Sequence, residues 1–408
     1  MFSLSKQNKQ VILLYVSTVL GLLLGLLSSI INTRFLDPLS YGDVRYVQNI
    51  ISFIASLLLF GYFLSGSRLL ALSTSEEKSR KIRGCMIVIL LAASVVLVFG
   101  SFLNYFFHYA NPSLAILFII SLPVCLNPLL LNYINTTAQG DNHIVRLSVA
   151  RLLPAFIYIP LAYWVYKAYG ATSTRMILLQ WGVHTVVALV IIFSARPSFK
   201  NLRATFNELN RENKQYGIQL YYGSLVMVAT NYIAGVTLGI FNSDNSNVAF
   251  YTLALTVTGP IAMLPSIIGT TYFKKFATLD RIPPRVLKVT LLMTVGTCIL
   301  FILLIRPVVK FLYPESYAIV GVYASWLAFG FCIHGIGDMI NRYLGSHGQG
   351  KSIRNSSIAN GILKIFGFTV LVYFFNVPGA LFTNVLCSTI YCVILIYYYI
   401  KFINKKTV

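Results

Sequence analysis

The chain has 408 residues, of which 57% are hydrophobic and 11% are charged, whereas a soluble globular protein carries roughly 25% charged residues. With a mean hydropathy of +0.75, this composition excludes a large water-soluble enzyme and indicates a polytopic membrane protein. The formal net charge of +21 would suggest a nucleic-acid partner in a soluble protein, but on loops between apolar segments it is a topology signal, so no nucleic acid is expected.

Apolar segments follow one another along the whole chain. A helix needs about 20 apolar residues to cross about 30 Å of hydrocarbon, and this criterion predicts twelve spans. They cover residues 11–31, 44–66, 84–107, 113–134, 147–167, 175–195, 216–240, 248–272, 286–305, 318–341, 358–376 and 378–400. The first is expected to be a retained helix and not a cleaved signal peptide.

The distribution of lysine and arginine predicts the orientation of these spans. With the N-terminus in the cytoplasm, 25 of these residues fall in inside segments and six in outside segments. Under the positive-inside rule this asymmetry places both termini in the cytoplasm, and the even number of spans agrees.

The two halves of the chain resemble each other at a spacing of 207 to 210 residues. This shift brings 138–142 onto 348–352 and 170–171 onto 379–380. Each half holds six spans, so the repeat is parallel, and such proteins bind substrate near the midplane between their lobes. The predicted fold is therefore an all-α polytopic membrane protein with about twelve transmembrane helices in two six-helix lobes. The lobes are predicted at 1–200 and 216–408, with a cytoplasmic linker at 201–215.

Proline and glycine occur inside several predicted spans. Proline pairs lie in the fourth, fifth and eighth spans, and three glycines lie between 330 and 337 in the tenth. Helix breakers are tolerated in membranes where helices line a cavity or bend during transport, although they also occur in helices without such roles. They are expected to mark moving parts.

One short motif matches a nucleotide-binding pattern, but its context does not fit. Residues 345–352, GSHGQGKS, match G-x-x-x-x-G-K-[ST]. That pattern binds phosphate between a strand and a helix of an α/β domain, whereas here it follows a predicted membrane helix in a short loop. We therefore expect no ATP and no other cofactor. The cysteines and histidines show no metal-ligand spacing, so neither a metal nor a catalytic residue is predicted.

Ionisable residues inside the spans are candidate functional residues, because each costs about 2.5–3.5 kcal/mol to insert and usually faces a cavity or a partner. Lys364 is the clearest case, since it lies about seven residues, or about 10 Å, into the eleventh span. Asp338 and Arg342 are four residues apart on one helix face and are able to pair. Arg151 enters the fifth span to a similar depth.

In the repeat alignment, each half supplies cations near its predicted cytoplasmic end. Arg151 falls three residues from the counterpart of Lys364, and Arg68 falls on Lys275. A basic vestibule for an anionic substrate is the functional hypothesis, and anchoring or snorkelling to headgroups is the alternative. The predicted substrate-contacting cations are Lys364, Arg151, Arg342, Arg68, Lys275, Arg45 and Arg34. The last two flank the first outside loop, where Asp37 and Asp43 can pair with them.

Three residues are candidates for coupling transport to protons or ions. Asp338 is the acid that the pattern places within a span, and His334 and His184 lie in the tenth and sixth spans. Histidine titrates near neutral pH and can relay protons. A hydrogen-bonded packing role is the alternative for both histidines.

Short motifs, in this order and spacing, resemble a known family. They are NTRFLDPLSYG at 32–42, NVAFYTLA at 247–254, YPESY at 313–317, GQGK at 348–351 and VPGA at 377–380. The first resembles the family's R-x-L-G-P-x-x-F-G, with Asp-Pro in place of Gly-Pro. On these motifs the chain resembles the polysaccharide flippases of the multidrug/oligosaccharidyl-lipid/polysaccharide exporter superfamily, most closely the O-antigen flippases of Gram-negative bacteria.

The resemblance implies a transporter and not an enzyme. Its substrate would be an undecaprenyl-pyrophosphate-linked oligosaccharide, such as an O-antigen repeat unit, moved from the cytoplasmic to the periplasmic leaflet of the bacterial inner membrane by alternating access. Its partners would be this lipid-linked substrate, the membrane lipid, a polysaccharide polymerase and a chain-length regulator. A basic lumen would offset part of the desolvation of the pyrophosphate.

Three alternatives stay open at this point. A multidrug cation antiporter of the same superfamily would share the fold but should carry acidic residues in its cavity, and the first six spans contain none. The peptidoglycan-precursor flippases usually have fourteen helices, whereas about twelve fit here. A membrane-embedded polysaccharide polymerase or acyltransferase would be expected to show a large outer loop or a clustered histidine and carboxylate site.

Overall fold

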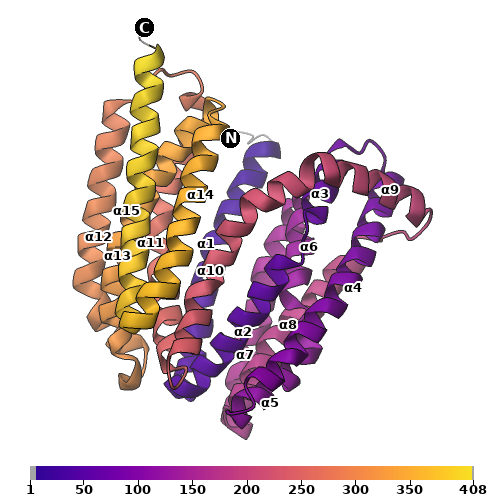
Figure 1. The fold of residues 1–408 in the computed structure, drawn as a ribbon, viewed down its shortest axis with the longest axis vertical. Coiled ribbons are helices and arrows are strands. Elements are labelled where there is room, and N and C mark those ends of the chain that lie inside the picture. Colours follow the sequence, from indigo (N-terminus) through magenta and orange to yellow (C-terminus); the bar gives the residue numbers. More distant parts are fainter. Residues whose placement is uncertain (1–5, 407–408) are drawn as a thin grey trace, which may run out of the picture. The chain divides into compact units, whose positions relative to one another are not determined.

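The computed structural model describes residues 6–406, and every regular element in this range is helical (Figure 1). The longer helices are α1 (Lys6–Phe35), α2 (Pro38–Leu57), α3 (Tyr62–Leu72), α4 (Glu76–Phe107), α5 (Pro112–Ser121), α6 (Asn127–Gly140), α7 (Ile144–Tyr169), α8 (Ser173–Ser194), α9 (Leu202–Glu212), α10 (Ile218–Phe241), α11 (Ser246–Phe276), α12 (Pro284–Leu312), α13 (Ile319–Ser346), α14 (Gly350–Phe366) and α15 (Val372–Lys406). Short 3-10 turns are η1 (Leu122–Val124) and η3 (Glu315–Tyr317), and π-helical turns are η2 (Asn213–Gly217) and η4 (Gly367–Leu371).

Each of the twelve expected spans coincides with helix in the structure. Three spans are built from more than one piece: α2 and α3 form the second, α5, η1 and α6 form the fourth, and α14 and η4 form most of the eleventh. Within the described residues, eight helical stretches are long and apolar enough to cross a membrane, or nine with the bent pair of α2 and α3. The predicted all-α polytopic membrane fold is confirmed.

Capping residues at the ends of the apolar runs explain where several helices begin. The side chain of Asp37 accepts the N–H of Ser40 at the start of α2, where Pro38 occupies the first helical position. Ser75 caps α4 and Thr172 caps α8 in the same way. Each cap satisfies a backbone N–H that the first turn of a helix leaves without a partner.

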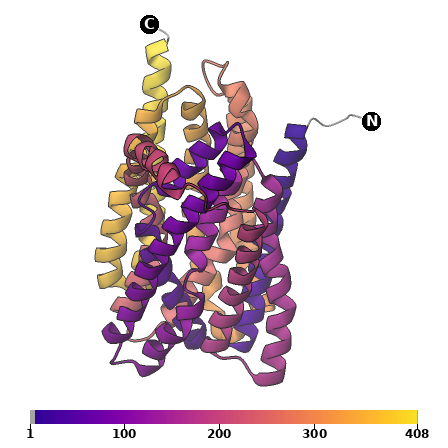
Figure 2. The same cartoon turned by 90° about the vertical axis from the view of Figure 1, so that its right-hand side faces the viewer.

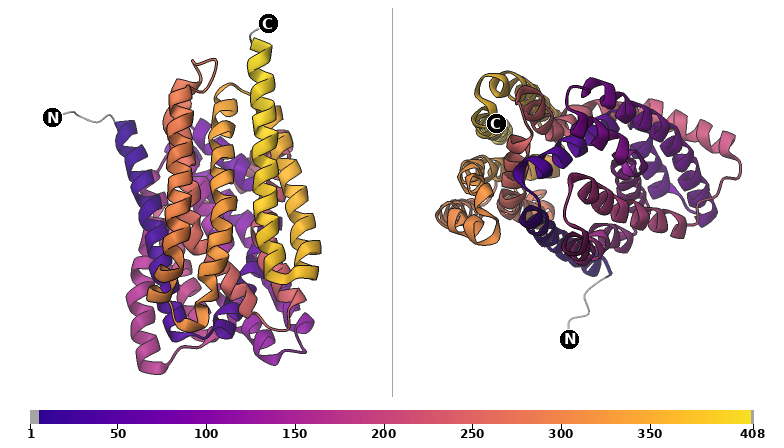
Figure 3. Two further views of the ribbon diagram at one scale, coloured as in Figure 1. Left: turned by 90° about the vertical axis from the view of Figure 1, so that its left-hand side faces the viewer. Right: turned by 90° about the horizontal axis from the view of Figure 1, so that it is seen from below.

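A tight turn separates the last two spans. The longest apolar stretch, Gly350–Asn404, folds back on itself at Asn376, whose φ of 53° is left-handed. A Cβ at Gly379 would collide with the carbonyl of Leu371, so only glycine allows this approach. The boundary predicted between residues 376 and 378 lies at this turn. The two arms of the hairpin run side by side (Figure 3, left).

The chain divides into two compact units, Met1–Ala229 and Thr230–Val408. In the first unit α1 packs on α7, α3 packs on α6, and α7 packs on α8. Residues 201–215, expected to be a linker, fold as α9 and part of η2, and α9 packs on α3 and α4. Figures 1 and 2 show α9 at the end of this unit where α3 ends and α4 begins. In the second unit α13 is central and contacts α11, α12, α14 and α15.

The sharpest bend within a span lies in the second span and contains no proline. The axes of α2 and α3 differ by 63°, and the break lies at residues 58–61, where Phe60 and Gly61 have φ values of 42° and 78°. In contrast, α7 and α11 each continue as one helix through two prolines. Prolines therefore coincide with an interruption in the fourth span, where η1 separates α5 from α6, but not in α7 or α11, and the 63° break lies at a glycine.

A buried ion cluster holds one end of the first unit together. Arg83 of α4 is only 1% exposed. Its guanidinium donates to Asp141 (2.8 Å), to Glu76 (2.9 Å) and to the carbonyl of Ala195 (2.9 Å). Arg146 approaches the same Asp141 carboxylate at 3.4 Å. In the sequence Arg83 lies directly before the predicted span 84–107, and the structure shows it joining α4 to the ends of α6 and α8.

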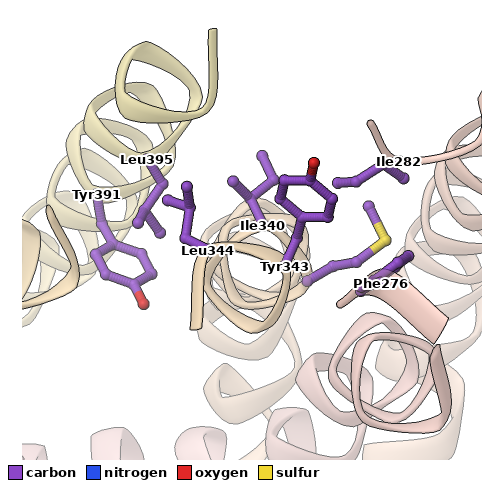
Figure 4. Packing of buried hydrophobic residues seen from close by; sticks show 8 residues of the cluster. Phe276, Ile282, Ile340, Tyr343, Leu344, Tyr391 and Leu395 are labelled. Carbon is purple, nitrogen blue, oxygen red and sulfur yellow. The ribbon is translucent and has the colours of Figure 1, made fainter. Parts of the chain in front are cut away.

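An aromatic cluster occupies one end of the second unit (Figure 4). Tyr343 of α13 is fully buried, and its ring packs against Phe276, His347 and Tyr399. Its hydroxyl donates to the carbonyls of Leu279 (3.1 Å) and Asp280 (2.6 Å) in the loop between α11 and α12. This end of the second unit is therefore held mainly by ring packing.

Candidate functional site

The described residues of the second unit bring three of the predicted functional residues together with a tyrosine and an asparagine. His334 and Asp338 face each other one turn apart on α13, with Nε2 and Oδ1 4.0 Å apart. Tyr391 of α15 donates its hydroxyl to Oδ1 of Asp338 (3.3 Å) and accepts the amide of Asn341 (2.7 Å). The rings of His334 and Tyr391 stack with centroids 4.7 Å apart. We call these four residues and Lys364 the α13–α15 polar cluster.

Lys364 of α14 supplies the cation of this cluster. Its side chain is half-buried and lies within electrostatic range of Asp338, His334 and Cys387. Asn360 lies one turn earlier on the same helix, is 7% exposed, and its Oδ1 has no hydrogen-bond partner among the described residues. A lysine and a buried amide one turn apart present donors from one face of α14.

Asp338 does not form the ion pair with Arg342 that their spacing allowed. Among the described residues the closest basic group to its carboxylate is His334, and Arg342 is exposed. The backbone spacing is as expected, but Tyr391 occupies the position next to the carboxylate. A tyrosine hydroxyl is a hydrogen-bond donor to the carboxylate and carries no charge of its own.

A second polar chain links α2 and α8 in the first unit. Arg45 donates to the hydroxyl of Tyr41 (2.9 and 2.8 Å) and to Oε1 of Gln48 (3.0 Å). Gln48 donates to Oε1 of Gln180 (3.0 Å), and the ring Nδ1 of His184 lies 2.6 Å from the carbonyl of Gln180. Tyr41 and Gln48, which accept from the Arg45 guanidinium, are neutral, so Arg45 gives this polar chain a positive charge.

The other predicted cations are not brought into either cluster by the contacts of the described residues. Arg151 donates to Thr18 of α1 (2.7 Å), and Lys275 lies over the ring of Tyr272. Arg68 pairs with Glu212 (2.6 Å) and lies over the ring of Tyr216 (4.5 Å). Arg34 is exposed at the end of α1. These four residues serve helix contacts or lie on the surface of their own unit.

Sequence reasoning missed the neutral members of both clusters. Gln48, Gln180 and Tyr391 lie within predicted spans, where an amide or a buried hydroxyl needs a partner as much as a charge does. Counting only ionisable residues therefore located the charges and omitted the groups that orient them. A search for every polar side chain inside a span would have found these residues.

Comparison of the sequence with models of protein families assigns the chain to a family. The model of a family described as "Polysaccharide biosynthesis protein" matches residues 8–273. The chain belongs to the polysaccharide biosynthesis protein family. No curated protein sequence matches this member of the family.

Solved structures of transporters share the fold of this polysaccharide biosynthesis protein. The lipid II flippase MurJ in an inward closed conformation matches with a TM-score of 0.72 at 16% identity, over 97% of this chain and 89% of that chain. An inward-facing multidrug resistance MATE family transporter of the MOP superfamily matches with a TM-score of 0.69 at 15% identity, over 94% and 95% of the two chains. A MOP superfamily transporter from Pyrococcus furiosus gives 0.61 at 15% identity over 96% and 94%. At these identities the likeness concerns the fold.

Proposed function

We propose that this polysaccharide biosynthesis protein is a flippase that moves an undecaprenyl-pyrophosphate-linked oligosaccharide, such as an O-antigen repeat unit, from the cytoplasmic to the periplasmic leaflet. The observation that carries the proposal is Lys364, a half-buried cation on a membrane helix within electrostatic range of Asp338 and His334. A lysine in a span is costly and usually marks a substrate pathway. Family membership supports a role in polysaccharide synthesis.

The charge of the proposed substrate fits the cations of the clusters. A pyrophosphate headgroup carries about two negative charges, and its transfer from water is unfavourable unless cations and hydrogen-bond donors accompany it. Lys364 and Arg45 supply positive charge, while Asn360, Gln48 and Gln180 supply amides. An inside-negative potential also favours outward movement of an anion by about 2.3 kcal/mol per charge per 100 mV.

The proposed mechanism is alternating access with two six-helix lobes, 1–200 and 216–408, as the moving parts and residues 201–215 between them. We further propose the bacterial inner membrane as the location, both termini in the cytoplasm, and a polysaccharide polymerase with a chain-length regulator as later partners. The 25-to-6 distribution of lysine and arginine supports this orientation.

The proposal is tested in proteoliposomes that contain only this protein and a defined undecaprenyl-pyrophosphate oligosaccharide, with and without an imposed ion gradient. Protein-dependent movement between leaflets is expected. Lys364→Ala should lower the rate at least tenfold at unchanged protein abundance, and Lys364→Arg should retain more activity because it keeps the charge. Lys288→Ala, which removes an exposed lysine of α12, is the matched control. Unchanged movement in Lys364→Ala would remove Lys364 from the substrate path.

A second candidate function is cation antiport, and Asp338 favours it. A carboxylate within a span can bind a cationic drug or a coupling ion, and multidrug transporters share the fold. Uptake of a cationic dye by the same proteoliposomes, lost in Asp338→Asn, together with no movement of any lipid-linked sugar, would select this function over the flippase.

A further inference from the structure

The break between α2 and α3 is held by side chains from the segment that connects the two halves of the chain. Carbonyls at the end of a helix have no partner within that helix. Tyr221 donates its hydroxyl to the carbonyl of Leu57 (2.7 Å), and the amide of Asn213 donates to the carbonyl of Phe60 (3.1 Å). Two residues more than 150 positions away therefore satisfy the carbonyls that the bend exposes.

Asn213 and residues of α9 also contact α3 itself. Ser65 of α3 donates its hydroxyl to Oδ1 of Asn213 (3.1 Å), so both ends of this buried amide are used. Tyr62 donates to Asn210 (3.1 Å), and its ring stacks on that of Phe206. The first turn of α3 is thus bonded along its length to the segment 206–213.

Two glycines bring the backbones of these segments into direct contact. A Cβ at Gly61 would collide with the carbonyl group of Gly217, and a Cβ at Gly217 would collide with Ser65 and with the carbonyl of Gly61. Gly61 also needs its positive φ of 78°. No other residue at either position keeps this contact, which is therefore close-packed.

The contact between α9 and α4 is looser. A polar cavity of about 330 Å³ lies there, lined by residues that include Ser75, Asn201 and Thr205. The ion pair Lys78–Glu208 (2.7 Å) at its edge is partly exposed, and such pairs contribute about 0–1 kcal/mol. The connecting segment is therefore fixed to α3 more firmly than to α4.

The connecting segment leads directly into α10. Residues 213–217 form a π-helical turn, a rare element that often occurs at functional positions. From Ile218 the chain continues as one helix to Phe241, past the end of the first unit at Ala229. A displacement of α10 therefore acts first on Asn213, Gly217 and Tyr221.

We propose that residues 206–221 and α3 form a rigid joint that transmits displacement of α10 to the second span, with residues 58–61 as the hinge. Asn213 and Tyr221 are positioning residues, because they hold the hinge carbonyls and touch no substrate in this proposal. The inference rests on the proposed function in one respect, namely that the chain undergoes a transport cycle. In that cycle the contacts of α3 with Asn213 and Gly217 stay closed, and α2 moves relative to α3 at the hinge as the bond from Tyr221 to Leu57 opens.

Hydrogen–deuterium exchange of the full-length protein tests the joint without any substrate. Tyr221→Phe and Asn213→Asp each remove one donor to a hinge carbonyl, so exchange of the amides at 58–65 should become about three- to tenfold faster. Tyr222→Phe and Asn210→Asp are matched controls, because the first removes the neighbouring exposed hydroxyl and the second keeps an acceptor for Tyr62 while adding the same charge. Unchanged exchange in both test variants would overturn the joint.

Transport measurements test whether the joint must remain closed. Gly217→Ala, which forces the backbones apart, should lower translocation of the lipid-linked oligosaccharide at least fivefold at unchanged abundance. Linking the pair Ser65→Cys and Asn213→Cys with a short thiol cross-linker should leave translocation within about twofold of the unlinked pair. Loss of translocation on linking, restored by cleavage of the linker, would show that the contact opens and would overturn the proposal.

Full translocation by Gly217→Ala, together with fast amide exchange at 58–65 in the same variant, would also overturn the proposal, because the joint would then be dispensable for transport. If the wild-type protein moves no lipid-linked sugar, the proposed function fails on its own. The exchange experiment then still tests whether the joint exists. Transport of a cationic dye by the same linked pair still tests whether the joint stays closed.

Discussion

Different interactions hold together one end of each unit. In the first, the buried Arg83 bonds to the buried carboxylate of Asp141, to the carbonyl of Ala195 and to the exposed carboxylate of Glu76. In the second, the ring of Tyr343 packs against rings of α11 and α15, and its hydroxyl donates to the carbonyls of Leu279 and Asp280. The first arrangement needs every partner, whereas ring packing tolerates the loss of one polar contact.

This difference teaches that the repeat expected from the sequence does not extend to the interactions at these ends. The sequence alignment sets 138–142 against 348–352, but residues 138–140 end α6, whereas residues 350–352 begin α14. Asp141 follows α6 and takes part in the Arg83 cluster, whereas Lys351, which the alignment sets against it, is exposed in the first turn of α14. The end of the second unit is held by aromatic packing.

The largest loss in the free energy of unfolding is expected when Arg83 is removed from the end of the first unit. Arg83→Met keeps much of the side-chain volume but leaves Asp141, whose side chain is 4% exposed, without its closest cation. Removal of one partner of a buried pair costs about 3–5 kcal/mol. We expect a loss of this size in the free energy of unfolding measured by denaturant titration in mixed micelles.

The double variant Arg83→Met with Asp141→Leu is the control for this effect. Replacement of a buried pair by apolar residues is often close to neutral, so the double variant should be more stable than Arg83→Met alone. If both proteins lose the same stability, the cost of Arg83→Met comes from packing and not from an unpaired charge.

A smaller effect is expected at the aromatic end. Tyr343→Phe retains the ring contacts and removes the hydroxyl that donates to Leu279 and Asp280. Loss of such a bond costs about 0.5–1.5 kcal/mol, which the same titration can measure. Tyr398→Phe, one position before a ring that contacts Tyr343, is the matched control. A loss above about 3 kcal/mol would show that the hydroxyl holds this end as firmly as Arg83 holds the other.

The smallest effect concerns the cap of α2 and depends on pH. Burial raises the pKa of Asp37, but hydrogen bonds from the hydroxyl and N–H of Ser40 lower it more, so the pKa lies below its usual value. The carboxylate therefore stabilises the fold above its unfolded pKa of about 3.8, and this stabilisation is lost as the pH falls through the lower folded value.

Asp37→Ala should accordingly lower the free energy of unfolding by about 0.5–2 kcal/mol at pH 7, and by less as the pH falls below about 3.8. Asp37→Ser keeps an N-cap acceptor without the charge, so its stability should show no such dependence on pH. Equal losses for Asp37→Ala at pH 7 and pH 3 would contradict an ionised cap.

Most of the fold was predictable because its signals are local. Twelve runs of about 20 apolar residues coincide with helices, and the turn at Asn376 lies between two such runs. Lys364, His334 and Asp338 were found as charges inside spans, and the structure places them in one cluster. Such features need no knowledge of distant parts of the chain.

Features that depend on distant partners were not predictable. The α2–α3 break uses Asn213 and Tyr221 as partners for its carbonyls, and the apolar sequence around Gly61 gives no sign of them. Burial of Arg83 requires Asp141, which lies 58 residues away. Tyr391 replaces Arg342 beside Asp338 because α15 packs on α13, a contact that helical periodicity alone does not contain.

The turn at Asn376 has a consequence for biogenesis. Because Gly379 lies against Leu371, hardly any chain remains outside the bilayer between the last two spans. Such a hairpin is expected to leave the translocon as a pair. The apolar α15 then shares the insertion penalty of Lys364, about 2.5–3.5 kcal/mol when a helix enters alone. A truncation after residue 376 should therefore leave α14 poorly inserted, which glycosylation-site mapping of the nascent chain would detect.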